Sequence, residues 1–316
     1  MKKVVITDHV YPSLDYEKKM LKEVGAELVE TKGTGEEEII SAVKDADAVI
    51  TCFAEITERV ILSMEKCKSI SRTGIGVNNV DIQAATQKGI KVMNVPDYCI
   101  QEVSDHAMAF LLSLAKKIPA LNNAVKNGCW SFEEQRPINR LSEQTLGLVG
   151  FGRIARLVAA KALPFGLKVI AYDPFISEET MLLNNAAKVS LEELYQQSDY
   201  ISLHLPLTKD TVQMIAEKAL NIMKPTASII NTSRGALIDE KALYEALKSK
   251  KIAAAALDVL SNEDYDPQNP LFSLENIIFT PHSGFYSVEA TQELREKIIS
   301  DLLAVLAGKE PKYLVN

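Results

Sequence analysis

The chain has 316 residues, of which 47% are hydrophobic and 24% charged, and its formal net charge is −7. This composition indicates a globular protein with enough apolar residues to build two cores. The negative balance argues against nucleic acid and acidic membrane surfaces as main partners. No uncharged run approaches the length of a membrane span, and the N-terminal apolar run is too short for a signal sequence. We therefore expect a cytoplasmic protein.

The chain contains four scattered cysteines, and no two of them form a C-x-x-C pair. Spacing of this kind is typical of reduced thiols in an intracellular protein. We expect no disulfide framework and no metal site.

The first hundred residues alternate short apolar runs with segments of helical periodicity. The predicted strands are 4–7, 26–29, 48–51, 69–72 and 91–94, and the predicted helices are 16–24, 36–43, 57–65 and 81–88. This alternation predicts a parallel sheet with helices on both faces. Because the alternation is complete before residue 100, we expect a smaller domain of its own here.

A long helix is predicted over 101–117, and we expect Pro119 to end it. The segment 121–140 that follows is weakly patterned and contains Trp130, the only tryptophan. Long segments without a clear pattern are usually functional or lie in interfaces. We expect an arm that packs on a second copy of the chain, and an intramolecular surface loop is the alternative.

A glycine-rich turn follows the next predicted strand, 146–149, and leads into a helix. Gly150 allows the tight turn, Gly152 lets a pyrophosphate approach the backbone, and Ala155 lets the helix pack closely. Asp173 ends the following strand, where its carboxylate would accept hydrogen bonds from the adenosine ribose and repel a 2′-phosphate. The pattern predicts an NAD site, and a βαβ unit without a nucleotide is the alternative.

Strands and helices continue to alternate after Asp173. The predicted strands are 200–203, 228–231, 253–257 and 277–279, and the predicted helices are 191–197, 218–223, 239–248 and 288–306. The last helix is long enough to return to the first domain.

Three charged or titratable residues follow strands of this second half. Arg234 is suited to grip a carboxylate in a bidentate fork, and His282 is suited to accept and donate a proton near neutral pH. Glu263 would orient the imidazole and favour its protonated form. Each residue alone is compatible with a surface or structural role. Their joint placement at the carboxyl ends of strands favours a redox site.

The other three histidines are weaker candidates. His204 precedes Pro206 in a loop that borders the cofactor, so we expect it to be structural or to lie at the cofactor rim. Neither His106 nor His9 has a carboxylate partner suggested by its position in the chain.

Four motifs in order resemble the D-isomer-specific 2-hydroxyacid dehydrogenases: GLVGFGRIA with Asp173, NTSRGALID, ALDV with Glu263, and TPH. The resemblance covers essentially the whole chain, including SRTGIGVNNVD and NVPDY. It implies an α/β fold of two Rossmann-like, doubly wound parallel sheets, with the cofactor domain inserted in a flavodoxin-like substrate domain, usually in a dimer. We therefore expect a substrate domain of 1–99 and 283–316, and an NAD-binding domain of 100–282.

The resemblance also implies a role for each matching residue. Arg234 would bind the substrate carboxylate, with Glu263 as the partner of the acid/base His282. The residues implied to contact NAD are Gly150, Gly152, Arg153, Ile154, Asp173, Leu205, Pro206, Thr232, Ser233 and Asp258. Those implied to contact the substrate are Arg72, Gly74, Ile75, Gly76 and Phe285. The glutamate loop lacks the family's usual proline, which leaves its local geometry open.

Three functions remain open at this stage. HSGFYS, NVPDYC and Arg72 resemble the branch that includes the C-terminal-binding proteins, although Phe285 stands where those have tryptophan. Phosphoglycerate dehydrogenases carry basic residues in the loop 51–55, where this chain has the acidic Glu55. We expect NAD(H)-dependent interconversion of a small 2-keto acid, similar to glyoxylate or hydroxypyruvate, and its D-2-hydroxy acid. The alternatives are D-3-phosphoglycerate dehydrogenase, which Arg72 supports, and an NAD(H)-sensing, corepressor-like binding protein.

Overall fold

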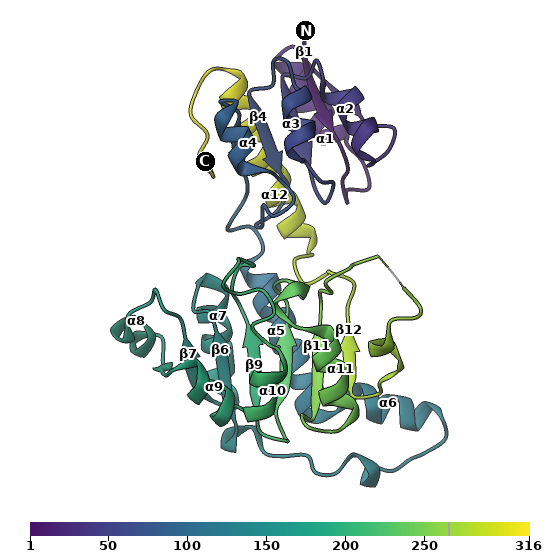
Figure 1. The fold of residues 1–316 in the computed structure, drawn as a ribbon, viewed down its shortest axis with the longest axis vertical. Coiled ribbons are helices and arrows are strands. Elements are labelled where there is room, and N and C mark those ends of the chain that lie inside the picture. The colour runs from purple at the N-terminus through teal and green to yellow at the C-terminus, as the bar shows by residue number, and fades with distance from the viewer. Residues whose placement is uncertain (265) are drawn as a thin grey trace. The chain divides into compact units, whose positions relative to one another are not determined.

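The computed structural model describes residues 1–264 and 266–316. The chain forms two compact units (Figure 1). Unit 1 consists of Met1–Tyr98 and Ser287–Asn316, and unit 2 consists of Cys99–Tyr286. Unit 2 is thus inserted in the chain of unit 1. Among the described residues, no helix combines the length and the apolar character that a membrane span requires.

Unit 1 is built on a five-stranded parallel sheet with the order β2-β1-β3-β4-β5. The strands are β1 (Lys2–Ile6), β2 (Ala26–Glu30), β3 (Ala48–Thr51), β4 (Ser69–Arg72) and β5 (Lys91–Met93). The helices are α1 (Asp15–Glu23), α2 (Glu36–Val43), α3 (Glu58–Ser63), α4 (Ile82–Gln87) and α12 (Val288–Leu306). This strand order is the flavodoxin-like one.

Two apolar layers cover the sheet of unit 1 because successive side chains of a strand point to opposite faces. Val5 and Val49 pack in the layer that contains α2 and α3. Val4 packs in the other layer, where Ile299 and Leu302 of α12 complete the core. The helix predicted to return to the first domain therefore closes one face of its sheet.

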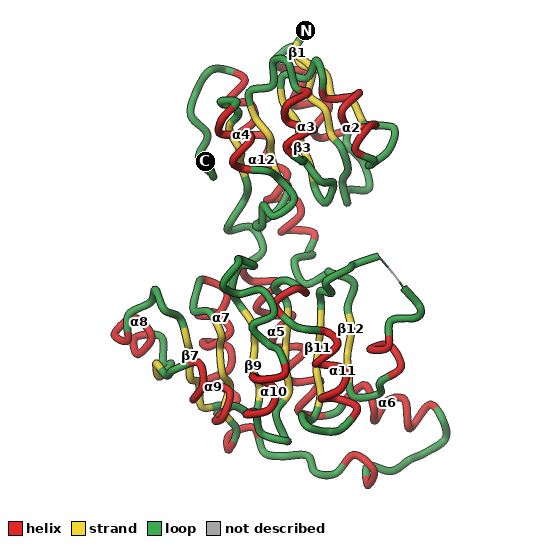
Figure 2. Tube along the Cα trace, in the orientation of Figure 1, coloured by secondary structure: helices red, strands yellow, loops and turns green. Residues whose placement is uncertain are grey.

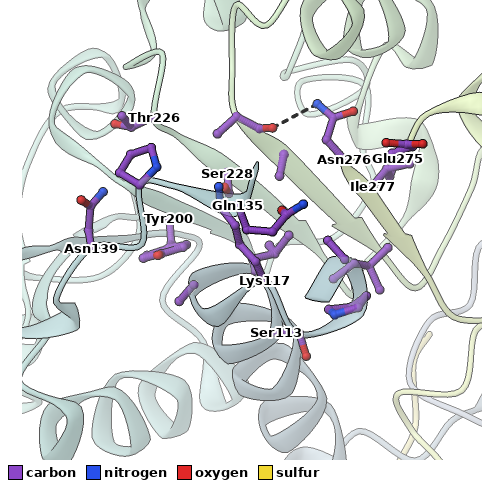
Figure 3. A pocket seen from close by; sticks show the side chains of 18 of the residues that line it. Ser113, Lys117, Gln135, Asn139, Tyr200, Thr226, Ser228, Glu275, Asn276 and Ile277 are labelled. Carbon is purple, nitrogen blue, oxygen red and sulfur yellow. Dashed lines mark hydrogen bonds between the residues drawn. The ribbon is translucent and has the colours of Figure 1, made fainter. Parts of the chain in front are cut away.

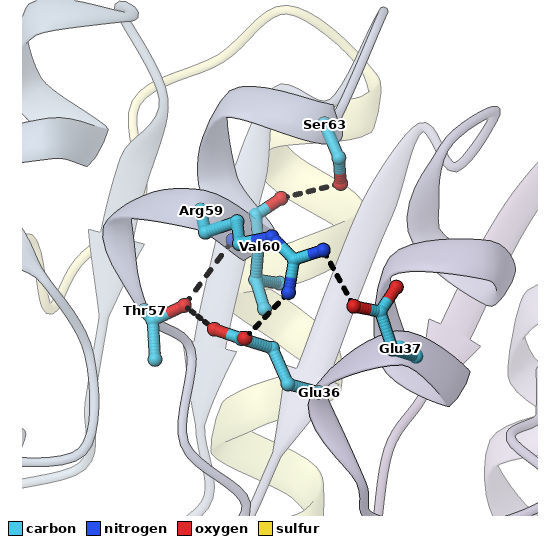
Figure 4. Close-up of polar contacts among 6 residues, drawn as sticks. All are labelled: Glu36, Glu37, Thr57, Arg59, Val60 and Ser63. Atoms are coloured by element: carbon cyan, nitrogen blue, oxygen red, sulfur yellow. Dashed lines mark hydrogen bonds and ion pairs between the residues drawn. The ribbon is translucent and has the colours of Figure 1, made fainter.

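Helices α2 and α3 are joined at the surface by polar contacts (Figure 4). The Thr57 hydroxyl caps α3 by accepting from the Val60 amide at 3.3 Å and donates to Glu36 at 2.5 Å. Arg59 pairs with Glu36 at 2.9 Å and with Glu37 at 2.5 Å. Hydrogen bonds from Thr57 and Arg59 lower the pKa of Glu36. Because these groups are exposed, we assign them a local structural role.

The described part of unit 2 contains a seven-stranded parallel sheet with the order β12-β11-β10-β9-β6-β7-β8. The strands are β6 (Thr145–Val149), β7 (Lys168–Tyr172), β8 (Ala187–Lys188), β9 (Tyr200–Leu203), β10 (Ser228–Asn231), β11 (Ala254–Leu257) and β12 (Ile277–Phe279). The α-helices are α5 (Ile100–Lys116), α6 (Ile118–Lys126), α7 (Arg153–Ala162), α8 (Glu178–Leu183), α9 (Leu191–Gln197), α10 (Glu217–Ile222) and α11 (Glu240–Lys248).

The sheet of unit 2 is doubly wound, and its strands run side by side in Figure 2. The chain moves from β6 outward to β7 and β8, and then returns to the other side of β6 with β9. The place between β6 and β9 is therefore the topological switch point, where ligands bind beyond the carboxyl ends of the strands. Helices α5 and α7 pack together over one face of the sheet. The predicted fold class, two Rossmann-like parallel sheets, is confirmed.

Three elements, α6, α8 and β8, differ from the prediction. Pro119 does not end the structure of its segment: α6 begins at Ile118 with this proline in its first turn, so 121–126 is helical and not irregular. Proline suits this position because a first-turn residue needs no intrahelical N–H bond. Lys117, in the left-handed conformation at φ +52°, separates α5 from α6. The short α8 and β8 were not predicted, and the remaining bounds agree within two residues.

Candidate active site

The glycine-rich turn after β6 holds two glycines with different structural reasons. Gly150 has a φ of +86°, and a Cβ there would lie 2.4 Å from the carbonyl oxygen of His204. No residue other than glycine therefore fits at position 150. Gly152 begins α7, and a Cβ there would meet no described atom within 4 Å. The backbone at Gly152 therefore faces open space, which is the arrangement that a pyrophosphate requires.

The N-terminus of α7 and the end of β7 provide the other groups that a dinucleotide needs. No side chain of the described residues caps α7, whose first residue is Arg153, so its first-turn amides remain available to an anion. The Asp173 carboxylate accepts the amide of Phe151 at 2.9 Å and the amide of Phe175 at 2.9 Å. These bonds fix the carboxylate beside the turn. The residues of this region fit an NAD molecule.

His204 lies after β9, on the other side of the switch point. Its Nε2 is 2.8 Å from the Ser202 hydroxyl, and burial lowers the pKa of His204 to about 4. The ring is thus neutral at pH 7 and is unsuited to proton transfer there. Leu205 and Pro206 follow directly, and Leu205 would contact a side chain at Gly150.

The segment after β10 carries Thr232, Ser233 and Arg234. Asn231 is fully buried and organises the turn: it accepts the Ser233 amide at 3.0 Å and donates to the Arg234 carbonyl at 2.8 Å. The buried Thr232 hydroxyl has no hydrogen-bond partner within the described ranges. Buried polar atoms are rarely left unsatisfied, so this hydroxyl retains the capacity for a further hydrogen bond. A Cβ at Gly235 would lie 1.9 Å from the Leu260 carbonyl carbon.

Glu263 and His282 meet although they follow different strands. Nδ1 of His282 is 2.7 Å from Oε2 of Glu263, with side chains 25% and 41% exposed. The carboxylate accepts at Nδ1, so a proton exchanged with a ligand would pass through the other ring nitrogen, Nε2. The Phe285 ring packs edge-on at 6.1 Å from the imidazole. A cavity of about 350 Å³ borders the pair, with Leu260 and Phe279 among its apolar walls.

Arg234, Glu263 and His282 follow β10, β11 and β12, which are neighbours in the sheet. The Arg234 guanidinium donates to the Ser233 carbonyl at 2.6 Å. Its carbonyl accepts from the buried Asn231, so both the side chain and the backbone of Arg234 are anchored. The structure therefore brings the three predicted catalytic residues to consecutive strand ends of unit 2.

Unit 1 holds the remaining predicted substrate residues. A Cβ at Gly74 would lie 1.5 Å from Nη1 of Arg72, so the guanidinium rests directly on this glycine. Nε of Arg72 is buried and has no hydrogen-bond partner in the described chain. The turn through Ile75 and Gly76 is held by the Asn94 amide, which donates to the Ile75 carbonyl at 2.6 Å. Arg72 thus has hydrogen-bonding capacity for an anion.

Two acidic residues have structural surroundings that the sequence did not reveal. Asp258, expected to contact NAD, is buried, and its carboxylate accepts the amides of Ser283 and Gly284 at 2.9 Å. It also lies 3.6 Å from His106, and this partner was not suggested by the position of His106 in the chain. The Asp8 carboxylate accepts the amides of residues 52–54.

A second cavity of about 420 Å³ lies at the amino ends of the strands of unit 2 (Figure 3). Its walls include Lys117 at the end of α5, Gln135 and Asn139 of the arm, and Tyr200 and Ser228 of the sheet. These strand ends are opposite to those that carry Arg234 and His282, so this cavity does not belong to the candidate active site. No cluster of His, Cys, Asp and Glu in the described residues is arranged to hold a metal ion.

Comparison with known proteins identifies relatives of the whole chain. Residues 108–284 match the family described as D-isomer specific 2-hydroxyacid dehydrogenase, NAD binding domain. The glyoxylate reductase of Thermococcus litoralis is 39% identical over 285 residues, which cover 88% of this chain and 86% of that one. The D-3-phosphoglycerate dehydrogenase of Methanocaldococcus jannaschii is 40% identical over 318 residues, which cover 100% of this chain but 60% of the relative. The chain thus spans about 60% of the length of that relative.

Solved structures show the same architecture. The D-lactate dehydrogenase from Aquifex aeolicus, complexed with NAD and lactic acid, has a TM-score of 0.88 and 29% sequence identity. The match covers 96% of each chain. An acyclic imino acid reductase in complex with NADPH and D-Arg has a TM-score of 0.87 and 30% identity, over 99% of this chain and 100% of that one.

Proposed function

The chain belongs to the D-isomer specific 2-hydroxyacid dehydrogenases, and from this premise we propose that it interconverts a small 2-keto acid and its D-2-hydroxy acid with NAD(H). The observation that carries the proposal is the 2.7 Å contact between His282 and Glu263 at the strand ends of unit 2. A histidine held by a carboxylate on one nitrogen is the usual base for the oxidation of a hydroxyl.

The bound cofactor would supply the redox chemistry, as a hydride acceptor in its oxidised form, NAD+, and as a hydride donor in its reduced form, NADH. His282 takes the hydroxyl proton on Nε2 in the oxidation and returns it in the reduction, while Glu263 keeps Nδ1 protonated. Arg234 binds the substrate carboxylate through its two terminal nitrogens and polarises the adjacent carbonyl. Phe285 packs against the imidazole and limits the space beside it.

We assign the cofactor to unit 2. The first-turn amides of α7 would bind the pyrophosphate, and the Asp173 carboxylate would accept from the ribose hydroxyls. Because a carboxylate at Asp173 repels a 2′-phosphate, NAD is favoured over NADP. Arg153, Ile154, Leu205, Pro206, Thr232, Ser233 and Asp258 are proposed to line the remainder of the cofactor site.

The substrate proposed first is a small acid similar to glyoxylate or hydroxypyruvate. The loop after β3 supports this choice, because it carries the exposed Glu55 and no cation between Thr51 and Glu55. Arg72, with Gly74, Ile75 and Gly76, would contact the anionic end of the substrate. D-3-phosphoglycerate is the second candidate, since the Nε of Arg72 lacks a partner among the described residues and would serve a phosphate equally well.

We also propose a homodimer through the arm 121–140. Trp130 is 90% exposed and Phe132 is 56% exposed, and large apolar side chains this exposed mark interaction surfaces. Light scattering of the wild type and of the double variant Trp130→Ser, Phe132→Ser tests the assembly. A dimer that becomes a monomer in the variant is the expected result, and a monomeric wild type would contradict the proposal.

NADH oxidation against a panel of acids tests the reaction. The panel contains glyoxylate, hydroxypyruvate, pyruvate, a branched 2-keto acid and phosphohydroxypyruvate. We expect His282→Ala to lower kcat by about 10³-fold, as for the loss of a general acid/base. Glu263→Gln should have a smaller effect, and Glu275→Gln, an exposed glutamate of the same unit, is the matched control.

The panel also separates the alternatives. A preference for phosphohydroxypyruvate over hydroxypyruvate would replace the first substrate by the second candidate. NADH binding without any turnover above that of His282→Ala would instead support the NAD(H)-sensing binding protein.

A further inference from the structure

A second histidine–carboxylate pair lies beside the residues that carry His282. His106 belongs to α5, which packs across β10 and β11 of unit 2. Its Nε2 is 2.8 Å from the Thr280 hydroxyl and 3.6 Å from Oδ1 of Asp258. The Asp258 side chain is only 2% exposed, so this contact is shielded from water. Nothing in the reaction proposed above uses His106.

Asp258 accepts hydrogen bonds from four residues of the segment 280–284, which carries His282. Its Oδ1 accepts from the Thr280 hydroxyl at 2.5 Å and from the Ser283 amide at 2.9 Å. Its Oδ2 accepts from the Gly284 amide at 2.9 Å, and its main-chain carbonyl accepts from the His282 amide at 2.8 Å. One buried aspartate therefore holds the segment 280–284 at four points, in addition to the backbone bond from the Thr280 amide to the Leu257 carbonyl.

The hydrogen bonds to Asp258 are needed because His282 has an unfavourable backbone conformation. Its φ is +50°, in the left-handed region that residues with a side chain rarely adopt. Such a conformation persists only when the surroundings hold it. If the contacts of Asp258 weakened, the backbone would relax and the imidazole would move away from Glu263.

The hydrogen-bond directions connect His106 to this segment. A threonine hydroxyl has one hydrogen, and that of Thr280 is donated to the Asp258 carboxylate. The Thr280 oxygen must therefore accept from His106, which requires a proton on Nε2 of His106. The chain of donors runs from His106 through Thr280 to Asp258, and it orients the carboxylate toward Ser283 and Gly284.

Packing holds the ring of His106 in place for this role. The Phe110 ring, one turn later on α5, contacts the imidazole edge-on at 4.5 Å. On the other side, a Cβ at Gly284 would lie 3.3 Å from Cγ of His106 and 2.8 Å from Oδ2 of Asp258. Only a glycine leaves both groups undisturbed.

We propose that His106 is a positioning residue for His282, acting through Thr280 and Asp258. The inference rests on the proposed function only in taking His282 as the acid/base. It predicts that removal of the donor at His106 or of the hydroxyl at Thr280 misaligns the imidazole without removing any group that contacts the substrate.

Two matched pairs of variants test the proposal. His106→Leu removes the donor, whereas His106→Gln keeps an N–H near the position of Nε2; Thr280→Val removes the hydroxyl, whereas Thr280→Ser keeps it. We expect His106→Leu and Thr280→Val to lower kcat about tenfold or more, because misplacement of a reacting group by an ångström is costly. NADH affinity and substrate KM should change less than twofold. His106→Gln and Thr280→Ser should recover most of kcat.

The pH profile of kcat and the NMR signal of the His282 Nδ1 proton distinguish positioning from general stability. We expect both to change in Thr280→Val and to return in Thr280→Ser. If His106→Leu and Thr280→Val both keep the wild-type kcat and pH profile while His282→Ala is inactive, the positioning role is overturned. The proposed function would then still stand. If His282→Ala is as active as the wild type, the proposed function fails, and the NMR signal still decides the inference. If His106→Leu does not fold, the Thr280 pair decides it.

Discussion

Each unit has a run of backbone amides at the carboxyl edge of its sheet, and the two runs are used in opposite ways. In unit 1 the amides of Cys52, Phe53 and Ala54 all donate to the Asp8 carboxylate, at 2.9, 2.6 and 3.2 Å. In unit 2 the first amides of α7, beyond Gly152, are capped by no described side chain. The same backbone feature is closed by the chain itself in one unit and left for a ligand in the other.

The comparison shows where each unit places its anion-binding capacity. Asp8 occupies the amides after β3, and the neighbouring strand β4 ends in a cation, Arg72, whose buried Nε has no hydrogen-bond partner in the described chain. In unit 2 the turn after β6 offers open amides and the helix dipole, and Arg153 follows it as the first residue of α7.

The largest effect is expected from closing the open amides of unit 2. Gly152→Val would place a branched side chain where no described atom lies within 4 Å, so stability should hardly change. NADH affinity should fall at least about 100-fold, because the side chain takes the space that a pyrophosphate needs. Titration of NADH fluorescence measures this loss, with Gly152→Ala as the milder matched variant. Unchanged NADH affinity would show that the cofactor does not approach α7.

The reverse change opens the closed amides of unit 1. Asp8→Ala leaves three amides without their acceptor and should lower the free energy of unfolding by about 3 kcal/mol. Urea unfolding measures the loss, and Asp15→Ala, an exposed aspartate, is the control. Added phosphate should raise the Tm of Asp8→Ala and leave the wild type unchanged. Equal phosphate responses of the two proteins would mean that the amides do not form an anion site once Asp8 is removed.

A pH dependence should arise at the open edge of unit 2. Burial lowers the pKa of His204 to about 4, whereas an unfolded histidine has a pKa of about 6.5. Between these values the unfolded state binds the extra proton, so stability is complete above pH 6.5 and is lost as the pH falls toward 4. The slope should approach about 1.4 kcal/mol per pH unit. Urea unfolding at pH 7, 5.5 and 4.5 gives the free energy of unfolding at each pH. This free energy should fall less steeply with decreasing pH in His204→Gln than in the wild type. The same pH dependence in both proteins would contradict the assignment.

The smallest effect is expected from the charge beside the closed amides. Glu55→Lys should raise kcat/KM for phosphohydroxypyruvate relative to hydroxypyruvate about threefold, since exposed charges contribute little. The gain in kcat/KM should shrink in 0.5 M salt, because the Debye length there is about 4 Å and the added charge is screened from the substrate. Glu58→Lys, on the exposed side of α3, serves as the control. An equal gain in both variants would indicate a general charge effect.

The sequence predicts two kinds of feature: elements that have a local hydrophobic periodicity, and residues that follow the ends of parallel strands. Buried strands such as β3 read as continuous apolar runs, and Glu263 and His282 were expected together because parallel strands end at one edge. The role of His106 depends on how α5 crosses the sheet, which brings it to Thr280 from 174 residues away. The contact of Asp8 with Cys52 spans 44 residues and has the same cause.

Short or ambiguous local signals account for the other differences. Pro119 is compatible both with the end of one helix and with the first turn of the next, and only the left-handed Lys117 separates the two outcomes. Helix α8 has six residues and β8 has two, which is too few for a periodic pattern to stand out.

The position of α12 has a consequence for synthesis on the ribosome. One apolar layer of unit 1 joins Val4 of the first strand to Ile299 and Leu302 near the end of the chain. Until those late residues emerge, the nascent chain carries an incomplete core that exposes apolar surface, while the intervening unit has all its own strands. The strands of unit 1 that precede unit 2 in the chain therefore become fully buried only after unit 2 has been translated.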